Sequence, residues 1–476
     1  MITQNTKKNV ISSTSLRGTK QSLTTEEDCR VAMASRNDVV KGHFNVAIIG
    51  AGPAGIMAAI AAAEKGAGVV LIEKNEAVGR KILATGNGRC NLTNSNIDIS
   101  RYHGSDLSFV SKVLGSFDQN ETIKYFESIG VITKEEALGR IFPRTNQAIS
   151  VVDALTARLK ALDVTIKTGF TVKSITNPSL SSPASQIKYD KLTGDLDSRL
   201  RGNDSDFWNI TDGNTNIFTA DKIILTTGGK AAHQFGSSGD GLFWAKNLGH
   251  TVIPIHAALV PLETEEEWVK ELMGIKLNTQ ASLSSNGKLL RSRTGDVIFT
   301  HFGISGPAAM GLAREVDPLL TAGQKVSLSL DITPELTSEK LEITLINLTS
   351  LDGKKMIKSI LSGLVPKNLV PRILMLASIN SEIKAAELSK SQRLAIIETI
   401  KSFPLTVSKV RPLKEAQVTA GGVSTTEVGE TLESKIVPNL YFAGEILDVD
   451  GDSGGFNLQW AWSSGKLAGQ SAASQN

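Results

Sequence analysis

The chain has 476 residues, of which 41% are hydrophobic and 21% charged, with 42 glycines and two cysteines. This composition excludes a disordered chain, a collagen and a disulfide-rich secreted scaffold, and the length predicts two or three domains. Residues 1–43 hold seven of the 51 basic and four of the 48 acidic residues, which accounts for the formal net charge of +3. The remainder is neutral overall, so net charge gives no argument for a nucleic-acid partner.

The two cysteines, Cys29 and Cys90, form no CxxC pair, which argues against a dithiol–disulfide oxidoreductase and favours a reducing, cytoplasmic location. The first residues lack the apolar core of a secretory signal. Residues 46–63 carry no charge over a length that could span a membrane, but Gly and Pro interrupt them at 50–55. We therefore expect a strand, a turn and a helix there, and no membrane attachment.

Strand-like and helical patterns alternate from Phe44 onward. In chain order, the patterns predict a strand at 44–49, a helix at 54–65, a strand at 69–73, a helix at 151–162, a strand-rich run at 164–175, a strand at 222–227, β-type runs at 280–283, 296–300 and 326–332, helices across 336–402, a strand at 440–443 and a helix at 459–468. Strands and helices alternate at both ends, whereas a group of strand-type runs followed by a group of helices lies between them. This order indicates a discontinuous nucleotide-binding domain that carries an inserted domain.

These patterns predict four parts of the chain. Residues 1–43 are polar and are expected to be a disordered extension. Residues 44–254 form the first part of the nucleotide-binding domain, with a polar insertion at 177–206 on a hairpin loop. Residues 255–408 form the inserted domain, and residues 409–476 complete the first one.

A GxGxxG motif follows the first predicted strand, with glycines at 50, 52 and 55. Gly50 permits the tight turn, Gly52 lets the backbone approach a pyrophosphate, and Gly55 lets the helix pack on the strand. Glu73 ends the next strand and can accept hydrogen bonds from a ribose, which also disfavours a 2′-phosphate. The spacing therefore predicts a dinucleotide site.

The far end of the chain favours FAD as this dinucleotide. A late strand closes on Gly444 and Glu445, and Gly455-Phe456-Asn457 leads into a late helix, so both can reach the distal half of a long cofactor. The run Leu225–Gly229 resembles the strand-to-glycine turn between the two halves of such flavoproteins. No second GxGxxG occurs, so NAD(P)H is expected only as a transient reductant.

Five further runs carry a family resemblance: 79–94, 236–241, 300–307, 419–423 and 444–460. Together they resemble the BaiN/RdsA-type bacterial NAD(P)/FAD-dependent oxidoreductases, also described as aminoacetone-oxidase-family flavoproteins, over about residues 44–476 without the polar stretch near 177–206. The resemblance implies an α/β, glutathione-reductase-like FAD-binding Rossmann domain, discontinuous, with an inserted β-barrel plus helical domain. It also implies reductive chemistry on a conjugated carbonyl, with a small molecule or ribosomal RNA as substrate.

The motifs and the resemblance together predict the cofactor-binding residues. They are Gly50, Gly52, Pro53, Ala54, Gly55, Glu73, Lys74, Arg80, Lys81, Thr85, Gly86, Gly88, Arg89, Cys90, Asn91, Thr227, Gly228, Gly229, Gly444, Glu445, Gly455, Phe456 and Asn457. No metal is expected. Asp448, Asp450 and Asp452 alternate as in some calcium loops but lack the EF-hand spacing, so we expect a flavin-site loop there.

Reducing an activated C=C needs a hydride at one carbon and a proton at its neighbour. Cys90 is the first candidate proton donor, because the adjacent Arg89 could lower its pKa; the alternative is a packed cysteine near the flavin. His301 is a second candidate catalytic residue, against a purely local role. Arg140 and Arg144 bracket Phe142-Pro143 and could form an anion-binding rim.

Three functions remain open from the sequence. The first is an FAD-dependent reductase of an enone-like metabolite, supplied with electrons by NAD(P)H. The second is a ribosomal RNA dihydrouridine synthase, and the third an FAD-binding protein with a structural or sensing role. A basic rim at the cleft that includes Arg140, Arg144, Arg291 or Arg293 would favour RNA, whereas a closed apolar pocket would favour a metabolite.

Overall fold

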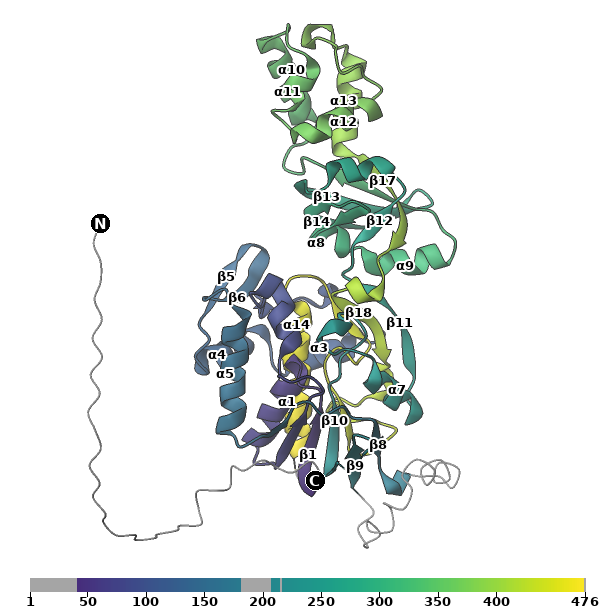
Figure 1. Cartoon of the computed structure of the whole chain (residues 1–476). Helices are drawn as coiled ribbons and strands as arrows, with labels where there is room; N and C mark the ends of the chain where they lie inside the picture. Colours follow the sequence, from purple (N-terminus) through teal and green to yellow (C-terminus); the bar gives the residue numbers. More distant parts are fainter. Residues whose placement is uncertain (1–40, 181–206, 215, 475–476) are drawn as a thin grey trace, which may run out of the picture. The chain divides into compact units, whose positions relative to one another are not determined.

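The computed structural model describes residues 41–180, 207–214 and 216–474 (Figure 1). Nearly all of the predicted N-terminal extension and of the predicted polar insertion therefore lie outside the described residues, as does Cys29. Strand β1 (Lys41–Ile49) begins three residues before Phe44. Strands β8 (Ser174–Thr176) and β9 (Trp208–Thr211), on either side of the insertion, pair antiparallel.

The first domain is built on a seven-stranded sheet whose order is β7-β2-β1-β10-β9-β8, with β19 paired to β10. The other members are β2 (Val69–Ile72), β7 (Thr165–Lys167), β10 (Ile217–Leu225) and β19 (Leu440–Phe442). Strands β7, β2, β1, β10 and β19 run parallel. All of β2 and β19 and the last residues of β1 and β10 are buried, as expected for a sheet covered on both faces. Strand β10 thus lies between β1, from the start of the described residues, and β19, from near their end.

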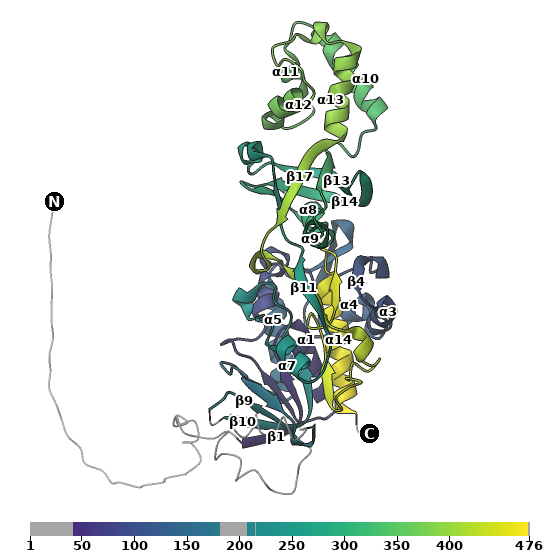
Figure 2. The same ribbon diagram turned by 90° about the vertical axis from the view of Figure 1, so that its right-hand side faces the viewer.

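Helices α1 (Pro53–Glu64) and α14 (Phe456–Ala473) lie side by side against this sheet (Figures 1 and 2). Helix α1 is alanine-rich and buried from Ala54 to Ala62, which suits a helix enclosed on all sides. A Cβ at Gly465 would lie 2.3 Å from Ala54 O, and one at Gly469 would lie 2.2 Å from Ala58 O. The two backbones can approach this closely only because α14 has glycine at both positions.

The rest of the first domain surrounds this pair. Its helices are α2 (Arg80–Ala84), α3 (Leu107–Gly115), α4 (Gln119–Ser128), α5 (Ala148–Ala161) and α7 (Asp240–Asn247). A small sheet has the order β3-β6-β5, from β3 (Thr93–Asn94), β5 (Thr133–Glu136) and β6 (Arg140–Pro143). Strand β4 (Tyr102–Gly104) pairs with β20 (Val449–Gly451), and β11 (Val252–Ala258) pairs with β18 (Val418–Val423).

The inserted segment contains a closed six-stranded barrel in the order β12-β15-β14-β13-β16-β17. Its strands are β12 (Leu262–Thr264), β13 (Lys276–Ser285), β14 (Lys288–Phe299), β15 (Gly303–Ser305), β16 (Val326–Asp331) and β17 (Phe403–Val410). Helices α8 (Pro307–Met310) and α9 (Ala313–Thr321) follow β15. Inward positions alternate with exposed ones along β13, as the wall of a small barrel requires.

Four helices lie between β16 and β17: α10 (Ser338–Leu351), α11 (Ile357–Leu361), α12 (Val370–Leu376) and α13 (Lys390–Lys401). They share one hydrophobic core with the barrel, separate from the core of the first domain. The predicted fold class, a Rossmann-type domain interrupted by a barrel and helices, is confirmed. Among the described residues, no helix combines the length and apolarity needed to span a membrane.

We expect Gly469→Ala to lower the free energy of unfolding by about 1–3 kcal/mol, because the new methyl group would force α14 away from α1. Denaturant unfolding followed by circular dichroism measures the change. Gly115→Ala, at the end of α3 where a Cβ meets nothing within 4 Å, is the matched control and should not destabilise the protein. Equal losses for both variants would contradict the packing argument.

Candidate active site

A cavity of about 630 Å³ lies where the two ends of the first domain meet the inserted segment. The N-termini of α1 and α14 and the end of β2 line it from the first domain. Residues of β14, β15 and α8 line it from the barrel, and residues 415–418 line it just before and at the start of β18. A cavity at the carboxyl ends of parallel strands, facing two helix N-termini, suits an elongated anionic ligand.

The glycine turn between β1 and α1 is shaped for a close approach. A Cβ at Gly55 would lie 1.8 Å from Gly50 O, and one at Gly50 would lie 2.6 Å from Thr226 O. By contrast, a Cβ at Gly52 would meet no atom within 4 Å, and Gly52 lines the cavity. Gly50 and Gly55 therefore serve packing, whereas Gly52 leaves open space in front of the first amides of α1.

Glu73 stands at the end of β2 with its carboxylate held in place. Its Oε2 accepts a hydrogen bond from the Ala51 amide at 2.8 Å. Its Oε1 accepts from the backbone amide of Asn75 at 2.9 Å and from the Asn75 side chain at 2.6 Å. Glu73 is 8% exposed and lines the cavity beside the glycine turn, where a ribose hydroxyl would find an acceptor.

Two buried polar side-chain atoms of the cavity lining have no partner among the described residues. Asn91 Oδ1 and Thr227 Oγ1 are both buried and make no hydrogen bond there. Buried polar atoms are almost always satisfied, so both atoms indicate a polar ligand. They lie after α2 and after β10. Thr227 stands beside the glycine turn, because a Cβ at Gly50 would lie 3.1 Å from its Cα. A ligand that meets both atoms must therefore reach from that turn to the segment after α2.

The cations around the cavity are mostly paired with acids. Lys74 Nζ lies 3.3 Å from an oxygen of Asp240, and Lys81 is paired with Glu445. Glu445 also accepts a hydrogen bond from the Thr419 amide at 2.9 Å, which ties the strand β18 to the turn after β19. These pairs keep most of the cavity's charge balanced.

Arg89, from the segment after α2, is paired with Glu136. Its two terminal nitrogens each donate to Glu136 at 3.0 Å, and its guanidinium lies over the Phe142 ring at 3.9 Å. The two side chains that donate to Glu136, Arg89 first and then Lys134, lower the pKa of Glu136 to about 2. Arg89 is therefore committed to a carboxylate rather than available to a neighbouring thiol.

The barrel supplies a largely apolar wall. Its cavity-lining side chains include Ile298, Pro307 and Met310, and Leu259 and Val418 continue the same wall. Glu415 is the acid on this side, and the hydrogen-bonded guanidinium of Arg411 holds its pKa below the usual range. Glu415 is thus a carboxylate at neutral pH and cannot donate a proton there.

The structure corrects the expectation for Cys90. The thiol is completely buried and does not line the cavity, and burial raises its pKa to about 12 instead of Arg89 lowering it. His301 is exposed, packs on the Phe302 ring at 4.8 Å between centroids, and does not line the cavity either. The geometry favours the alternative roles, a packed cysteine and a local histidine.

Most predicted cofactor residues meet at this one cavity. The lining includes Gly50, Gly52, Pro53, Ala54, Glu73, Lys74, Arg80, Lys81, Thr85, Gly86, Arg89, Asn91, Thr227, Gly228, Gly444, Glu445, Gly455 and Asn457. Gly55, Gly88, Cys90, Gly229 and Phe456 lie outside the lining. A Cβ at Gly229 would meet the Thr419 side chain at 2.3 Å, so this glycine serves packing.

Sequence reasoning missed several lining residues. Phe170 and Val172 follow the parallel strand β7, and the rule that ligands bind at the carboxyl ends of strands could have found them. Trp460, in α14, is 2% exposed and also lines the cavity. On the barrel side, residues 305–307 lie in a run that carries the family resemblance. Ile298 and Met310 carried no local signal, since only the closure of the barrel brings them here.

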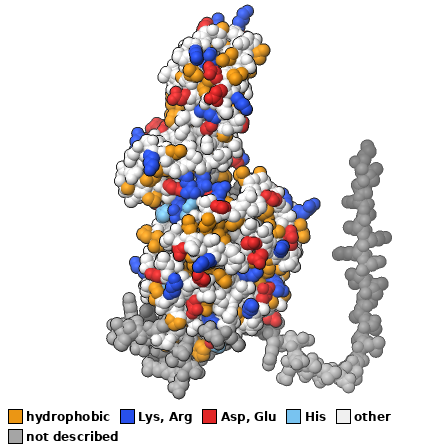
Figure 3. All heavy atoms as spheres, turned by 180° about the vertical axis from the view of Figure 1, so that it is seen from behind, with side chains coloured by type: hydrophobic (Ala, Val, Ile, Leu, Met, Phe, Trp, Pro, Cys, Tyr) orange, Lys and Arg blue, Asp and Glu red, His pale blue; other side chains and the backbone are white. Residues whose placement is uncertain are grey.

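The distribution of charged side chains matches the expected basic rim only in part. On the face in Figure 3 basic and acidic side chains are interspersed, apart from one band where Lys and Arg gather beside His. Arg140 lines the cavity, whereas Arg144 is exposed and does not. Arg291 and Arg293 are ion-paired with carboxylates and do not line it. Of the four arginines expected in the rim, Arg140 alone lines the cavity.

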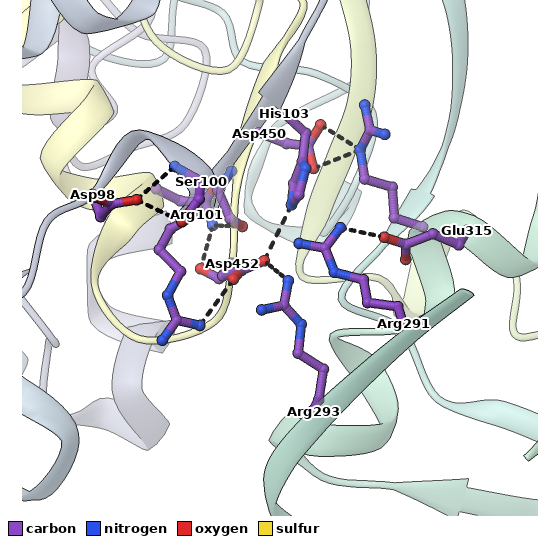
Figure 4. A network of polar contacts seen from close by, with 12 residues as sticks. Asp98, Ser100, Arg101, His103, Arg291, Arg293, Glu315, Asp450 and Asp452 are labelled. Carbon is purple, nitrogen blue, oxygen red and sulfur yellow. Dashed lines mark hydrogen bonds and ion pairs between the residues drawn. The ribbon is translucent and has the colours of Figure 1, made fainter. Parts of the chain in front are cut away.

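Asp450, in β20, and Asp452, just after it, form ion pairs that connect the first domain to the inserted segment (Figure 4). We call these pairs the clasp. Asp452 lies 2.6 Å from Arg293 of β14 and 3.1 Å from His103 of β4. Asp450 accepts from Nε of Arg314, in α9, at 3.0 and 3.1 Å. These oxygens bind cationic side chains, and no group of His, Cys, Asp or Glu suited to a metal occurs in the described part of the chain. Asp450 and Asp452 thus support the cavity loop, which continues through Ser453, from outside the lining.

Fold and cavity together define a Rossmann-type dinucleotide-binding protein with a barrel over its ligand site. The chain belongs to the family described as "HI0933-like protein Rossmann domain", whose model matches residues 44–471. This confirms the predicted family and, with it, the coarse class of FAD-dependent oxidoreductases.

Named relatives match almost along their whole length. A 3-dehydro-bile acid delta(4,6)-reductase of Clostridium scindens is 37% identical over 90% of this chain and 98% of its own. A ribosomal RNA dihydrouridine synthase of Escherichia coli is 30% identical over 89% and 96%. Among solved structures, a 3-ketosteroid-delta4-(5alpha)-dehydrogenase of Rhodococcus jostii matches with a TM-score of 0.43 at 14% identity, over 93% of this chain and 99% of that one.

We expect Asp452→Asn to lower the free energy of unfolding by about 1–3 kcal/mol at neutral pH, because Arg293 loses its counter-charge. Burial alone raises the pKa of Asp452, but the His103 hydrogen bond and the Arg293 charge outweigh it, so the pKa is lowered. The stabilisation is therefore present above about pH 4 and lost as the pH falls through the folded-state pKa.

Urea unfolding from pH 3 to pH 7 measures this difference, which should shrink at the acid end. Asp296→Asn is the control, because its pair with Lys276 is exposed and should contribute less than about 0.5 kcal/mol. A difference between Asp452→Asn and the unmodified protein that does not change with pH would contradict the electrostatic account.

Proposed function

We propose that this chain binds FAD in the cavity and reduces a carbon–carbon double bond conjugated with a carbonyl in a small, largely apolar molecule. The observation that carries the proposal is the continuity of the cavity. It runs from the glycine turn and Glu73, which suit a dinucleotide, to the apolar wall formed by Ile298, Pro307 and Met310. One relative is named a 3-dehydro-bile acid delta(4,6)-reductase, which supports the proposal.

The described residues fit FAD along the whole cavity. Gly52 and the first amides of α1 would hold the pyrophosphate, and Glu73 would hold the adenosine ribose. Asn91 and Thr227 would offer their unpartnered oxygens to the cofactor, and the N-terminus of α14 would face the ring system. FAD, when bound, supplies hydride transfer.

The chain's own contribution is placement and charge stabilisation. The barrel wall covers the ring end with apolar side chains, which would align a flat apolar substrate. No Cys, His or Tyr occurs among the described residues that line the cavity. We therefore assign the proton taken up by the substrate to water rather than to Cys90 or His301, and NAD(P)H remains the proposed reductant.

A second candidate is reduction of a uridine in ribosomal RNA. Two relatives are named ribosomal RNA dihydrouridine synthase. The band of basic side chains in Figure 3 would suit a polyanion such as RNA. Uridine also holds a C=C conjugated with a carbonyl, so the same site chemistry would serve. The reduction of the basic rim to Arg140 favours the small molecule. A third candidate, a structural or sensing flavoprotein, predicts a flavin that NAD(P)H cannot reduce.

We expect Gly52→Val to weaken FAD binding at least about tenfold with little loss of stability, because the side chain enters empty cavity space. The flavin content of purified protein and titration of the apoprotein with FAD measure this. Gly50→Val is the contrasting variant: its Cβ would overlap Thr226 O, so the fold itself should be destabilised. Normal flavin content in Gly52→Val would contradict the proposed pyrophosphate position.

Anaerobic assays test the reaction. The flavin-loaded protein should be reduced by NADH or NADPH and then reoxidised by a steroid enone in a single turnover, with the saturated ketone found by mass spectrometry. In parallel, nucleoside analysis of ribosomal RNA from cells with and without the gene reports dihydrouridine. Loss of dihydrouridine without enone turnover would replace the first candidate by the second, and a flavin that neither cofactor reduces would point to the third.

A further inference from the structure

Arg140 differs from the other cations that line the cavity. Lys74, Lys81 and Arg89 are each paired with a carboxylate, and Arg80 donates to the side-chain amide of Asn75. Arg140 donates only through Nε, to the Ala137 carbonyl at 2.9 Å. Its two terminal nitrogens have no partner among the described residues. Their N–H groups, which carry part of the positive charge, can therefore donate to a ligand.

The backbone holds Arg140 in a fixed place relative to the ring end of the cavity. Strand β6 lies between β3 and β5, and Arg140 is in register with Asn94 on one side and Glu136 on the other. The Asn94 side chain donates to the Gly454 carbonyl at 2.9 Å, immediately before the N-terminus of α14. Arg140 is thus tied to the loop that closes the distal half of the cavity.

The turn before Arg140 places two residues in the left-handed region and packs closely against residues 94–96. Leu138 is in the left-handed region at φ 64° and is 75% exposed. Gly139 follows at φ 73°, where a Cβ would lie 2.5–2.7 Å from side-chain atoms of Asn94, Ser95 and Asn96. Backbone strain of this kind persists where the surroundings enforce it, and it clusters at functional sites.

We propose, resting on the proposed function, that Arg140 binds the carbonyl oxygen of the substrate and stabilises the negative charge that develops there. The β-carbon takes up a hydride, for which reduced flavin is the reductant, and the C=C electrons shift toward the carbonyl. The oxygen becomes an enolate oxygen that accepts hydrogen bonds from the two terminal nitrogens of Arg140. The α-carbon then takes a proton from water, which restores the C=O and leaves the saturated ketone.

This role sets the substrate class. A double bond is reduced only when a carbonyl oxygen lies at the conjugated position, because the guanidinium lowers the barrier through charge that appears on that oxygen. An isolated alkene of the same shape is not a substrate. Arg140 and the apolar side chains of the barrel wall line the same cavity, so the site takes molecules with one polar edge and an apolar body.

The test compares Arg140→Gln, Arg140→Lys and Arg144→Gln in the flavin-loaded full chain. Arg144 is the matched control, four residues further on, exposed and outside the cavity lining. All variants should keep their flavin and their melting temperature. We expect Arg140→Gln to lower kcat for a steroid enone about 100- to 1000-fold, Arg140→Lys to lose less, and Arg144→Gln to match the unmodified protein.

Two readouts separate oxygen binding from a structural role. Added guanidinium ion should restore part of the turnover of Arg140→Gln. Calorimetric binding of the saturated ketone, which carries no developing charge, should weaken only about tenfold in that variant. Unchanged kcat in Arg140→Gln, with an active unmodified protein, would overturn the role of Arg140 alone. Absence of enone turnover and binding in the unmodified protein would overturn the proposed function itself.

Discussion

The contact between α1 and α14 is the constraint on which the site depends. These helices come from opposite ends of the described chain, and each presents its N-terminus to the same cavity. They can do so only because Gly465 and Gly469 bring the α14 backbone against Ala54 and Ala58. A larger side chain would separate the two N-termini, and with them the two halves of the ligand site. Packing of small residues is therefore part of the binding machinery.

The second constraint is the clasp that joins the barrel to the loop after β20. Asp450 and Asp452 are almost fully buried, and each is neutralised by an arginine of the inserted segment. Buried charges need partners of this kind, because an unpaired one costs several kcal/mol. Since the loop continues through Gly454 to the start of α14, the same contacts set the distance between the barrel wall and the ring end of the cavity. The pattern that resembled a calcium loop is thus a structural joint.

Local sequence placed the glycine turn and Glu73 close together, and both line the one cavity. The glycine turn and Glu73 follow one another within a single βαβ unit, so their geometry is decided by neighbours in the chain. Prediction of the reactive half was weaker. Cys90 looked reactive because Arg89 precedes it, but Arg89 turns toward Glu136, 47 residues away, and the thiol is buried. The apolar wall was not predicted, because Ile and Met, as at positions 298 and 310, are residue types that occur in any hydrophobic core.

The sequence by itself determined the class of fold, the glycine turn, the acid at the end of β2 and the family, because each is encoded by short-range spacing that constrains the backbone directly. The tertiary structure decided which charged residues are free to act. Arg140, Arg291 and Arg293 are indistinguishable as sequence letters, but folding pairs two of them with carboxylates and leaves the third facing the cavity. Whether a charge is neutralised depends on residues that only folding brings within a few ångströms, and no local pattern carries that information.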